Sequence, residues 1–463
     1  MKKLENWIFY IFLFSIPISL RHIFGFEPFN FIEWTAVYIS ATDILLLILL
    51  GFWAFNRERA MVLNPDPGNQ SRRFPQLRWD PFRYWVKDHR PFADIFLIIF
   101  VLVAGISIRN ALDVQTAVFQ WVKLVEGVAL YFYVKDYALK RFKLAHAFEA
   151  IVAGAVFQSV IAIAQFITQG SLGLKYLGES PLAPALSGIA AFFVDGVKIM
   201  RAYGTTPHSN VLALYLFVVI IVFYDSLIYH KKWWWYIFYS VILWAFFLTF
   251  SRVIVGLWVL GFILTVCAFK LSSGRRPSEA GETDGTGFMG LGLKAQAVSH
   301  NAQKIFWTTI AVAVLFVAVY WPYVVNRTVI STNDEAIQLR ILYNHESLAG
   351  GQSTFGLGMG NFVPWLMTQN LHLNREVYQP VHNIYLLIYA EVGIAGIALF
   401  ILFLAFLLYD FYNRLGFKKL YHFSFGLIII SVLVFGLFDH YLWTIQSGRL
   451  IFWLVLGLLA SAE

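Results

Sequence analysis

Long runs of apolar residues recur along the whole chain, and several reach the roughly 20 residues that an α-helix needs to cross a lipid bilayer. Backbone N–H and C=O groups cannot stay unpaired in hydrocarbon, so a membrane-spanning segment is either a helix or a strand of a closed barrel. Ten-residue segments of alternating apolar and polar residues, which mark a barrel, do not occur in this sequence. The sequence therefore predicts an all-α, polytopic membrane protein.

Charged residues make up only 13% of the 463 residues, about half the share that a soluble chain carries. The single cysteine, Cys267, excludes an intrachain disulfide and a cysteine-based metal site. The formal net charge of +8 does not indicate a nucleic-acid partner, because the basic residues are distributed according to membrane topology.

We expect about twelve membrane spans, near residues 7–20, 33–55, 92–108, 117–134, 145–168, 207–229, 233–250, 253–269, 305–321, 383–412, 423–438 and 449–460. The first is interpreted as an uncleaved span, because no small-x-small cleavage site follows it. With the N-terminus in the cytoplasm, about 24 of the 35 Lys and Arg residues lie on the cytoplasmic side. This positive-inside asymmetry predicts that both termini are cytoplasmic.

Two predicted cytoplasmic segments are polar connectors: residues 64–90, in a basic loop near 56–91, and residues 272–286, in a linker near 270–304. Two long loops are expected on the outer side, residues 169–206 and 323–381, and the second predicts a small external helical domain near 322–382. Within it, residues 332–335 resemble a capping box, opening a helix that Gly350 and Gly351 end.

Two arginines, Arg201 and Arg252, occupy outer positions that the positive-inside distribution disfavours. A third, Arg340, lies in the helix of the external domain, which could lie along the membrane surface and hold Arg340 at the level of the headgroups. A guanidinium group stays protonated and binds phosphate through two hydrogen bonds, so these residues predict a phosphate group held at the membrane surface. Contact with lipid headgroups is the alternative.

The outer loop also contains alternating glycines, including Gly358 and Gly360, followed by Asn361. Alternating glycines allow the close backbone approach that phosphate-binding loops require, and a tight turn is the alternative interpretation.

Residues His382 and Asn383 begin a long apolar helix, where backbone N–H groups favour anions, although an interfacial histidine is often only a solvated residue. Glu391 lies inside this helix, and Lys123 and Glu126 lie at helical spacing in another span. Ionisable groups within spans mark a functional or a paired site.

Five stretches carry a family resemblance: RAYGTTPHSNVLALYL from Arg201, FLTFSRVIVGL around Arg252, LRILYNHESLAG around Arg340, FGLGMGNF from Phe355 and HNIYLLIYAEVGIAG from His382. In this order they resemble the O-antigen ligase and polymerase superfamily of integral membrane glycosyltransferases. The match covers roughly the C-terminal 260 residues. Residues 207–210 read Pro-His-Ser-Asn where the family more often has Pro-Asn, which argues against a role for Asn210.

The resemblance implies a C-type glycosyltransferase fold, with N-terminal transmembrane helices in residues 1–200 and a ligase-like catalytic region in residues 201–463. It implies an outward-facing site in the cytoplasmic (inner) membrane that transfers glycan from an undecaprenyl diphosphate carrier to a hydroxyl of a lipid or glycan acceptor. Arg252 and Arg340 would bind the diphosphate, and His382 would serve the acceptor hydroxyl. The predicted substrate-binding residues are Arg201, Gly358, Gly360, Asn361, Asn383 and Glu391.

No Asp-x-Asp pair occurs in an outer loop, so neither a catalytic metal nor another cofactor is expected. A polysaccharide flippase or other transporter is the main alternative, and a structural or sensor membrane protein is the third. A transporter would place its key residues on both faces, whereas the candidates here lie on one. No residue distinguishes ligation from polymerisation, since these differ in the acceptor.

Overall fold

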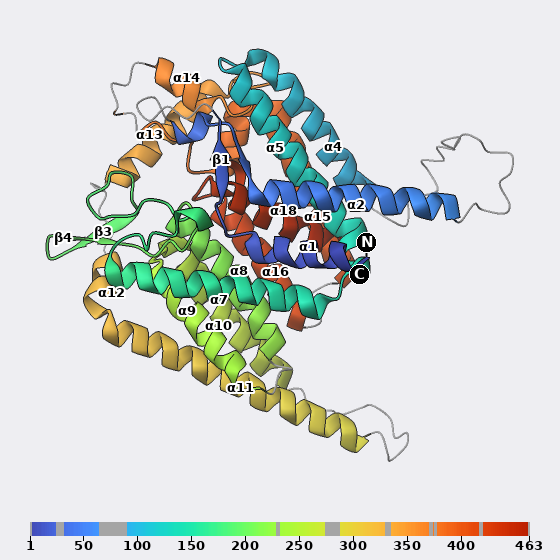
Figure 1. The fold of residues 1–463 in the computed structure, drawn as a ribbon, viewed down its shortest axis with the longest axis vertical. Coiled ribbons are helices and arrows are strands. Elements are labelled where there is room, and N and C mark those ends of the chain that lie inside the picture. The colour runs from blue at the N-terminus through green and yellow to red at the C-terminus, as the bar shows by residue number, and fades with distance from the viewer. Residues whose placement is uncertain are drawn as a thin grey trace.

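The computed structural model describes residues 2–24, 32–63, 90–227, 232–273, 288–328, 335–369, 374, 377–415 and 420–461. This part of the chain is mostly helical (Figure 1). Its α-helices are α1 (Lys2–Ser15), α2 (Ala41–Leu63), α4 (Arg90–Ser107), α5 (Val114–Tyr133), α6 (Leu139–Arg141), α7 (Leu144–Thr168), α8 (Ser209–Leu227), α9 (Trp234–Leu248), α10 (Arg252–Ser273), α11 (Phe288–Val319), α12 (Trp321–Thr328), α13 (Glu335–Gly350), α14 (Phe362–Thr368), α15 (Ile384–Leu415), α16 (Leu420–Phe435), α17 (Tyr441–Thr444) and α18 (Gln446–Ser461).

Five helical stretches of the described residues are long and apolar enough to cross a membrane. They span Phe92–Asn110, Val114–Arg141, Leu144–Thr168, His300–Val319 and Ile384–Asn413, and each coincides with a predicted span. Six further apolar helices are shorter, with 10–17 residues each. The total of twelve spans stays a prediction.

Local signals set the ends of two long helices. Helix α5 begins where the side chain of Asp113 accepts a hydrogen bond of 3.0 Å from the backbone N–H of Thr116, the usual arrangement at a helix N-terminus. Helix α7 ends at Gln169, whose φ of 51° lies in the left-handed region where helices commonly stop. These ends lie close to the predicted span limits at 117 and 168.

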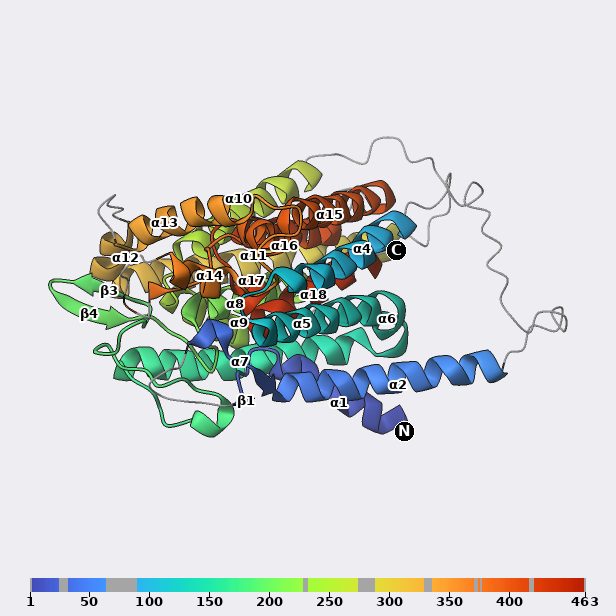
Figure 2. The same ribbon diagram turned by 90° about the horizontal axis from the view of Figure 1, so that it is seen from above.

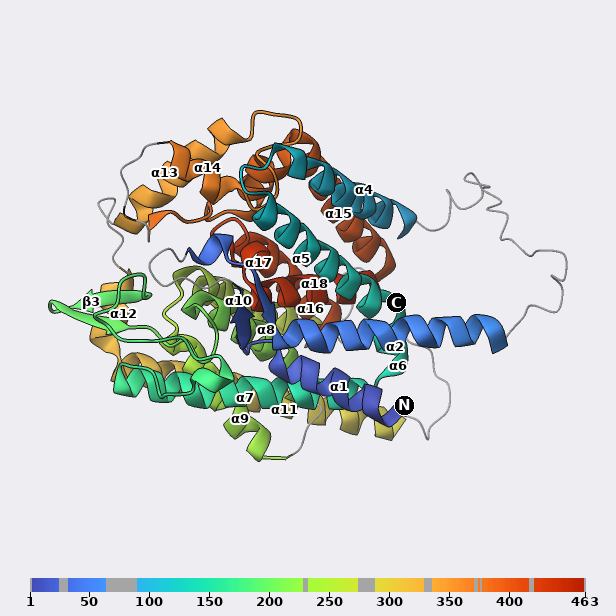
Figure 3. The same ribbon diagram turned by 45° about the horizontal axis from the view of Figure 1, so that its top comes forward.

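Helices from the two halves of the chain pack against one another. Helix α4 lies along α15, and α5 lies along α18, while α1 and α9 both contact α7 (Figure 3). Segments before and after residue 200 therefore build one common core.

Two short antiparallel hairpins were not predicted. One pairs β1 (Arg21–Ile23) with β2 (Tyr38–Ser40), with the 3₁₀-helix η1 (Glu33–Thr35) before β2, and the other pairs β3 (Ala191–Val194) with β4 (Val197–Met200). The β3–β4 turn is Asp195-Gly196, and both residues have positive φ, 50° and 81°. Two-residue hairpin turns require this conformation, so Asp-Gly between apolar residues was an available signal.

The ends of the helix bundle differ in content. The β3–β4 hairpin, α12 and α13 lie at one end, and the described parts of both termini lie at the other (Figure 1, Figure 2). The expected external domain thus contains α12, α13 and α14, and α13 ends at Gly350 as predicted. Residues 332–334 of the predicted capping box lie outside the described residues, as does most of both polar connectors.

A cluster of charged side chains lies inside the bundle between α2 and α5. Lys123 donates to Glu126 at 3.0 Å, which confirms the predicted interaction between these residues. Lys123 also forms an ion pair with Asp43 of α2, and the side chains of Lys123 and Asp43 are each 4% exposed. Because a buried unpaired charge is costly, this three-residue cluster satisfies ionisable groups that α2 and α5 bring into the core.

Candidate functional site

A cavity of about 680 Å³ is lined by residues of β3, α12 and α13, among other segments. Four residues singled out from the sequence line it: Arg201, Arg252, Arg340 and His382. They come from four separate segments, so helix packing brings them to one place. We call this space the cationic cavity.

Five arginines line the cationic cavity, because Arg21 and Arg327 join the three predicted ones. Only two carboxylates, Glu33 and Asp439, occur among its described lining residues. The formal charge of the wall is therefore positive, and a cleft lined by one sign of charge attracts an oppositely charged ligand.

Backbone contacts orient Arg252 and Arg327 relative to each other. Arg252 begins α10 and donates through Nε to the carbonyl of Arg327 at 2.8 Å, while Arg327 Nε donates to the carbonyl of Phe250 at 3.2 Å. Phe250 has a φ of 45°, the left-handed conformation in which α9 turns into α10. The turn thus fixes two guanidinium groups side by side.

Arg201 is buried and held more firmly. Its Nε donates to the carbonyl of Thr249, and its Nη2 donates to Asn210 Oδ1, both at 2.5 Å. Burial lowers the pKa of Arg201 to about 10, and Tyr203, Tyr441 and Asp439 oppose this effect. The guanidinium still carries its charge at neutral pH.

Asn210 links Arg201 to Asp439, a residue that follows α16. Asn210 Nδ2 donates to Asp439 Oδ2 at 2.8 Å. The other carboxylate oxygen, Oδ1, is buried and has no hydrogen-bond partner among the described residues. Burial raises the pKa of Asp439 to about 6, although the Asn210 hydrogen bond and the charge of Arg340 favour the ionised form.

His382 stands among aromatic rings. Its ring is parallel to that of Tyr343 at 6.0 Å and meets the ring of His440 edge-on at 4.9 Å. Burial and the charge of Arg340 lower the pKa of His382 to about 3, and a hydrogen bond to the carbonyl of Pro380 acts in the opposite direction. Nδ1 is buried without a partner in the described structure. A neutral ring that donates through one nitrogen offers a lone pair on the other, so His382 can accept the hydrogen bond of a hydroxyl that precedes proton transfer, although its lowered pKa makes it a weak base.

The glycine loop is not part of the cationic cavity. Gly356, Gly358 and Gly360 have positive φ values of 65°, 95° and 71°. A Cβ on Gly358 would lie 2.8 Å from the Cα of Ala111, and one on Gly360 would lie 2.5 Å from Cγ of Gln120. These glycines therefore allow close packing against the α4–α5 region, and Gly360 also lines a smaller neighbouring cavity.

The loop also fills a break in α15. Gly393 has a φ of 79° inside that helix, and the N–H groups of Leu357 and Gly358 donate to the carbonyls of Ala390 and Glu391 at 2.9 and 3.0 Å. Inserted backbone of this kind satisfies the groups that a broken helix leaves unpaired.

Three other predicted substrate-binding residues do not line the cationic cavity. Asn361 is fully buried and bonds the backbone of Asp113 through both its amide atoms, at 2.7 and 3.1 Å. Asn383 caps α15, accepting from the N–H groups of Tyr385 and Leu386 at 2.9 and 3.1 Å. Glu391 lines a smaller neighbouring cavity instead. The spacing of polar residues around His382 in the sequence suggested substrate binding and did not indicate these structural roles.

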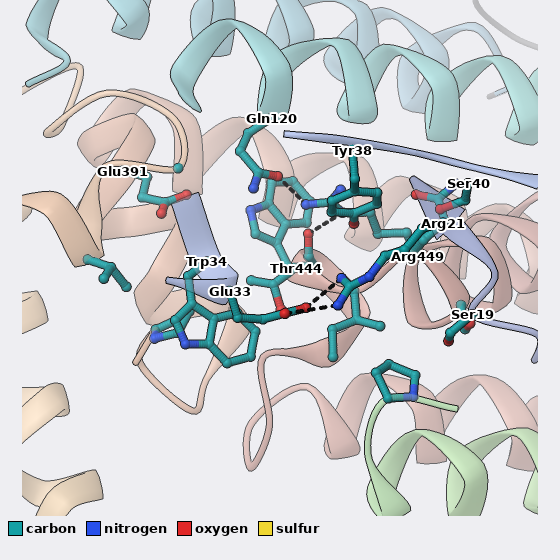
Figure 4. Close-up of a pocket in the computed structure, with 18 of the residues that line it drawn as sticks. Ser19, Arg21, Glu33, Trp34, Tyr38, Ser40, Gln120, Glu391, Thr444 and Arg449 are labelled. Atoms are coloured by element: carbon teal, nitrogen blue, oxygen red, sulfur yellow. Dashed lines mark hydrogen bonds and ion pairs between the residues drawn. The ribbon is translucent and has the colours of Figure 1, made fainter. Parts of the chain in front are cut away.

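This small cavity of about 40 Å³ adjoins the cationic cavity (Figure 4). The two spaces share Arg21, Glu33, Trp34, Pro207 and Ile445. Arg449 faces the small cavity and donates to Gln120 and to the carbonyl of Trp443, while its Nη1 has no partner among the described residues. Between the two cavities stands the Arg21–Glu33 ion pair, with contacts of 2.5 and 2.9 Å.

An apolar pocket of about 500 Å³ adjoins the cationic cavity elsewhere. The two share Ser251, Arg252 and Arg327. The rest of its wall is almost entirely apolar: Phe247, Phe250, Val255, Gly256, Trp258, Val259, Ala313, Phe316, Val317, Val324 and Thr328. A charged wall and an apolar wall thus meet at two arginines.

Five residues that lie in or next to the site were not selected from the sequence: Arg21, Trp34, Arg327, Asp439 and His440. Arg327 follows an apolar span on the predicted outer side, so the argument applied to Arg252 would have selected it as well. Asp439 and His440 are an ionisable pair directly after another span, which is a comparable signal. Arg21 directly follows the predicted span 7–20 on the outer side, so the same argument would have selected it, whereas Trp34 carried no local signal.

Within the described ranges, no three His, Cys, Asp or Glu side chains gather as a metal-binding group. No model of a protein family matches the chain, and a search of curated proteins finds no significant match.

Proposed function

We propose that this chain is an integral membrane glycosyltransferase of the O-antigen ligase and polymerase superfamily. It would transfer glycan from an undecaprenyl diphosphate carrier to an acceptor hydroxyl, in ligation or polymerisation of a surface polysaccharide. The observation that supports this most strongly is the meeting of the cationic cavity and the apolar pocket at Arg252 and Arg327.

A polyprenyl diphosphate combines a strongly anionic head with a long apolar tail, and both walls match it. The five arginines of the cationic cavity suit the diphosphate, which guanidinium groups bind through paired hydrogen bonds. The apolar pocket beyond Arg252 and Arg327 suits the first isoprene units of the tail, since burial of apolar surface is favourable. A soluble sugar nucleotide would leave the apolar pocket unused.

The reaction joins the acceptor oxygen to the anomeric carbon of the donor sugar. The bond between that carbon and the diphosphate oxygen breaks, and undecaprenyl diphosphate leaves with the bonding electrons. Negative charge grows on the leaving oxygen, and Arg252, Arg327 and Arg340 surround the space where the diphosphate would sit. Preorganised cationic donors stabilise such charge without reorganising during the reaction.

The acceptor hydroxyl loses a proton in the same step. His382 is neutral over the physiological range, since burial lowers its pKa to about 3, and its Nδ1 has no partner among the described residues. Asp439 lines the same cavity and is mostly ionised at pH 7, with a pKa raised to about 6. We assign proton acceptance to His382, with Asp439 stabilising the cationic ring that results.

The site would face outward from the cytoplasmic membrane. The cationic cavity lies at the end of the bundle opposite the described termini, and the positive-inside distribution assigns the termini to the cytoplasm (Figure 2). A flippase would require the donor to reach both faces, whereas the described cationic residues of the cavity gather at one end.

The deciding experiment follows the donor in cells that lack this chain. Carrier-linked glycan should accumulate on the outer leaflet, where periodate added to spheroplasts oxidises it, and the wild-type gene should reverse the accumulation. Accumulation on the inner leaflet, protected from periodate, would support the flippase instead. Unchanged carrier-linked glycan would contradict both functions. For the purified chain, transfer should persist in EDTA, because arginines rather than a metal would stabilise the leaving group.

A further inference from the structure

We propose that Trp34, together with the Arg21–Glu33 ion pair, forms the binding platform for the acceptor, and that this acceptor is a carbohydrate. One sugar ring would lie against the indole of Trp34 and present a hydroxyl to His382. The assignment of this sugar as acceptor rests on the proposed function, whereas sugar binding at Trp34 does not.

Trp34 lies close to His382 in the folded chain. The ring of Trp34 meets the ring of His440 at 4.8 Å and 86°, and His440 meets His382 at 4.9 Å and 82°. A single aromatic ring therefore separates Trp34 from the predicted proton acceptor. Trp34 and His382 both line the cationic cavity. A ligand against Trp34 therefore lies in the same cavity as His382, with the ring of His440 between the two side chains.

The chemistry around Trp34 carries the second step. A pyranose has an apolar C–H face and a rim of hydroxyl groups, and the electron-rich face of an indole attracts such C–H groups. Beside Trp34, the side chains of Arg21 and Glu33 are 24% and 30% exposed (Figure 4). The guanidinium donates hydrogen bonds and the carboxylate accepts them, so the pair satisfies hydroxyls in both roles.

The cationic cavity adjoins two other cavities at different parts of its wall. The cationic cavity adjoins the apolar pocket at Arg252 and Arg327, and it adjoins the small cavity at Arg21, Glu33 and Trp34. The donor lipid thus has its own wall, and Trp34 belongs to a different part of the lining. On that part of the lining, Trp34 and the Arg21–Glu33 ion pair lie beside the apolar Pro207 and Ile445. An aromatic ring beside a charged pair suits the C–H face and the hydroxyl rim of a glycan better than a second lipid tail.

The experiment measures glycoside binding without any donor. The full chain in lipid nanodiscs is mixed with methyl glycosides of glucose, galactose, mannose and N-acetylglucosamine, and saturation-transfer NMR reports which sugar protons contact the protein. At least one glycoside should give a saturation signal with the wild type. Trp34→Leu keeps an apolar side chain without a π-face and should weaken that binding about tenfold, whereas Trp34→Phe should stay within about threefold. Trp233→Ala, which removes a tryptophan that is 70% exposed and outside both cavities, is the matched control.

Unchanged binding in Trp34→Leu would overturn the proposal, as would the absence of a signal from every glycoside with the wild type. Glu33→Gln removes the ion pair with Arg21 but keeps the indole of Trp34, and it should weaken glycoside binding several-fold. If Trp34→Leu does not fold, unchanged glycoside binding by Glu33→Gln would overturn the proposal. Undecaprenyl diphosphate affinity, measured in parallel, should not change in Trp34→Leu. If the wild-type chain does not bind undecaprenyl diphosphate, the proposed function is refuted, whereas the proposal that sugar binds at Trp34 is not.

Discussion

Asn210 donates a hydrogen bond of 2.8 Å to the carboxylate of Asp439, although 229 residues separate the two along the chain. The same amide accepts from Arg201 at 2.5 Å. Asn210 therefore connects a buried cation to a buried carboxylate in the wall of the cationic cavity. This arrangement gives Asn210 a structural role, although the Pro-His-Ser-Asn sequence had argued against one, and it fixes the carboxylate of Asp439 in the wall that His382 also lines.

Replacing Arg252 or Arg340 with lysine should lower the rate of transfer by about 10²–10³. Lysine keeps the charge but cannot form two parallel hydrogen bonds to a diphosphate, and at position 252 it also loses the Nε contact to the carbonyl of Arg327. Initial rates at equal membrane abundance provide the measurement. Arg109→Lys is the control, because this exposed arginine stacks on Phe355 outside the cavity. Near-normal turnover by both variants would refute the diphosphate assignment.

His382→Ala should reduce transfer by about 10²–10⁴ while undecaprenyl diphosphate still binds, since a general base contributes to the chemical step. His382→Gln separates two roles, because glutamine forms hydrogen bonds without being basic. Strong loss in both variants supports proton acceptance. Substantial activity in the glutamine variant assigns His382 to positioning the hydroxyl, and loss of donor affinity in both would move it to the diphosphate site.

The pH dependence of kcat/KM should show one ionisation near pH 6. Burial raises the pKa of Asp439 to about 6, so its carboxylate is ionised above that pH and becomes protonated as the pH falls through it. His382, with a pKa of about 3, stays neutral over the same range. Activity that needs ionised Asp439 therefore declines below pH 6. The decline of kcat/KM below pH 6 should be absent in Asp439→Asn and should keep its midpoint pH in His382→Gln. An unchanged midpoint pH in Asp439→Asn would show that Asp439 is not the group that titrates.

Gly358→Ala should destabilise the fold by about 1–3 kcal/mol, because a Cβ there overpacks the site and a φ of 95° strains any other residue. The new Cβ would lie 2.8 Å from the Cα of Ala111. Thermal unfolding in detergent measures the loss, and Gly51→Ala, with nothing within 4 Å, is the neutral control. A phosphate-binding role would appear instead as lost diphosphate affinity at unchanged stability.

Labelling of engineered cysteines should place the two ends of the bundle on opposite sides of the membrane. In a Cys267→Ser background, Val197→Cys on the β3–β4 hairpin, where the valine is 60% exposed, should react with an impermeant maleimide in intact spheroplasts. Lys3→Cys, near the N-terminus, should react only after permeabilisation. The reverse pattern would turn the site toward the cytoplasm and contradict the proposed function.

Helix positions followed from the sequence because a helix satisfies its own backbone within a few residues and its apolar content is local. The span at 383–412 reappears as Ile384–Asn413, and the helix expected to end at Gly350 does so. The arginines were found in the same way, since charge at the end of an apolar run is visible without any tertiary contact. That these arginines line one cavity depends in addition on how the helices pack.

Long-range packing decided the rest. Arg21 and Trp34 lie about 400 residues before Asp439 in the chain, and all three line one cavity with His382 only because the segments that carry them pack together. The glycine loop is a second case in which the sequence leaves two interpretations open. Its alternating glycines are compatible with a phosphate loop or a tight packing turn, and the close approach to Ala111 and Gln120 is visible only in the folded chain. The sequence by itself determined the helices and the predicted outward charges, because both depend on nearby residues. The tertiary structure alone decided which side chains share a cavity, because that depends on contacts between segments hundreds of residues apart.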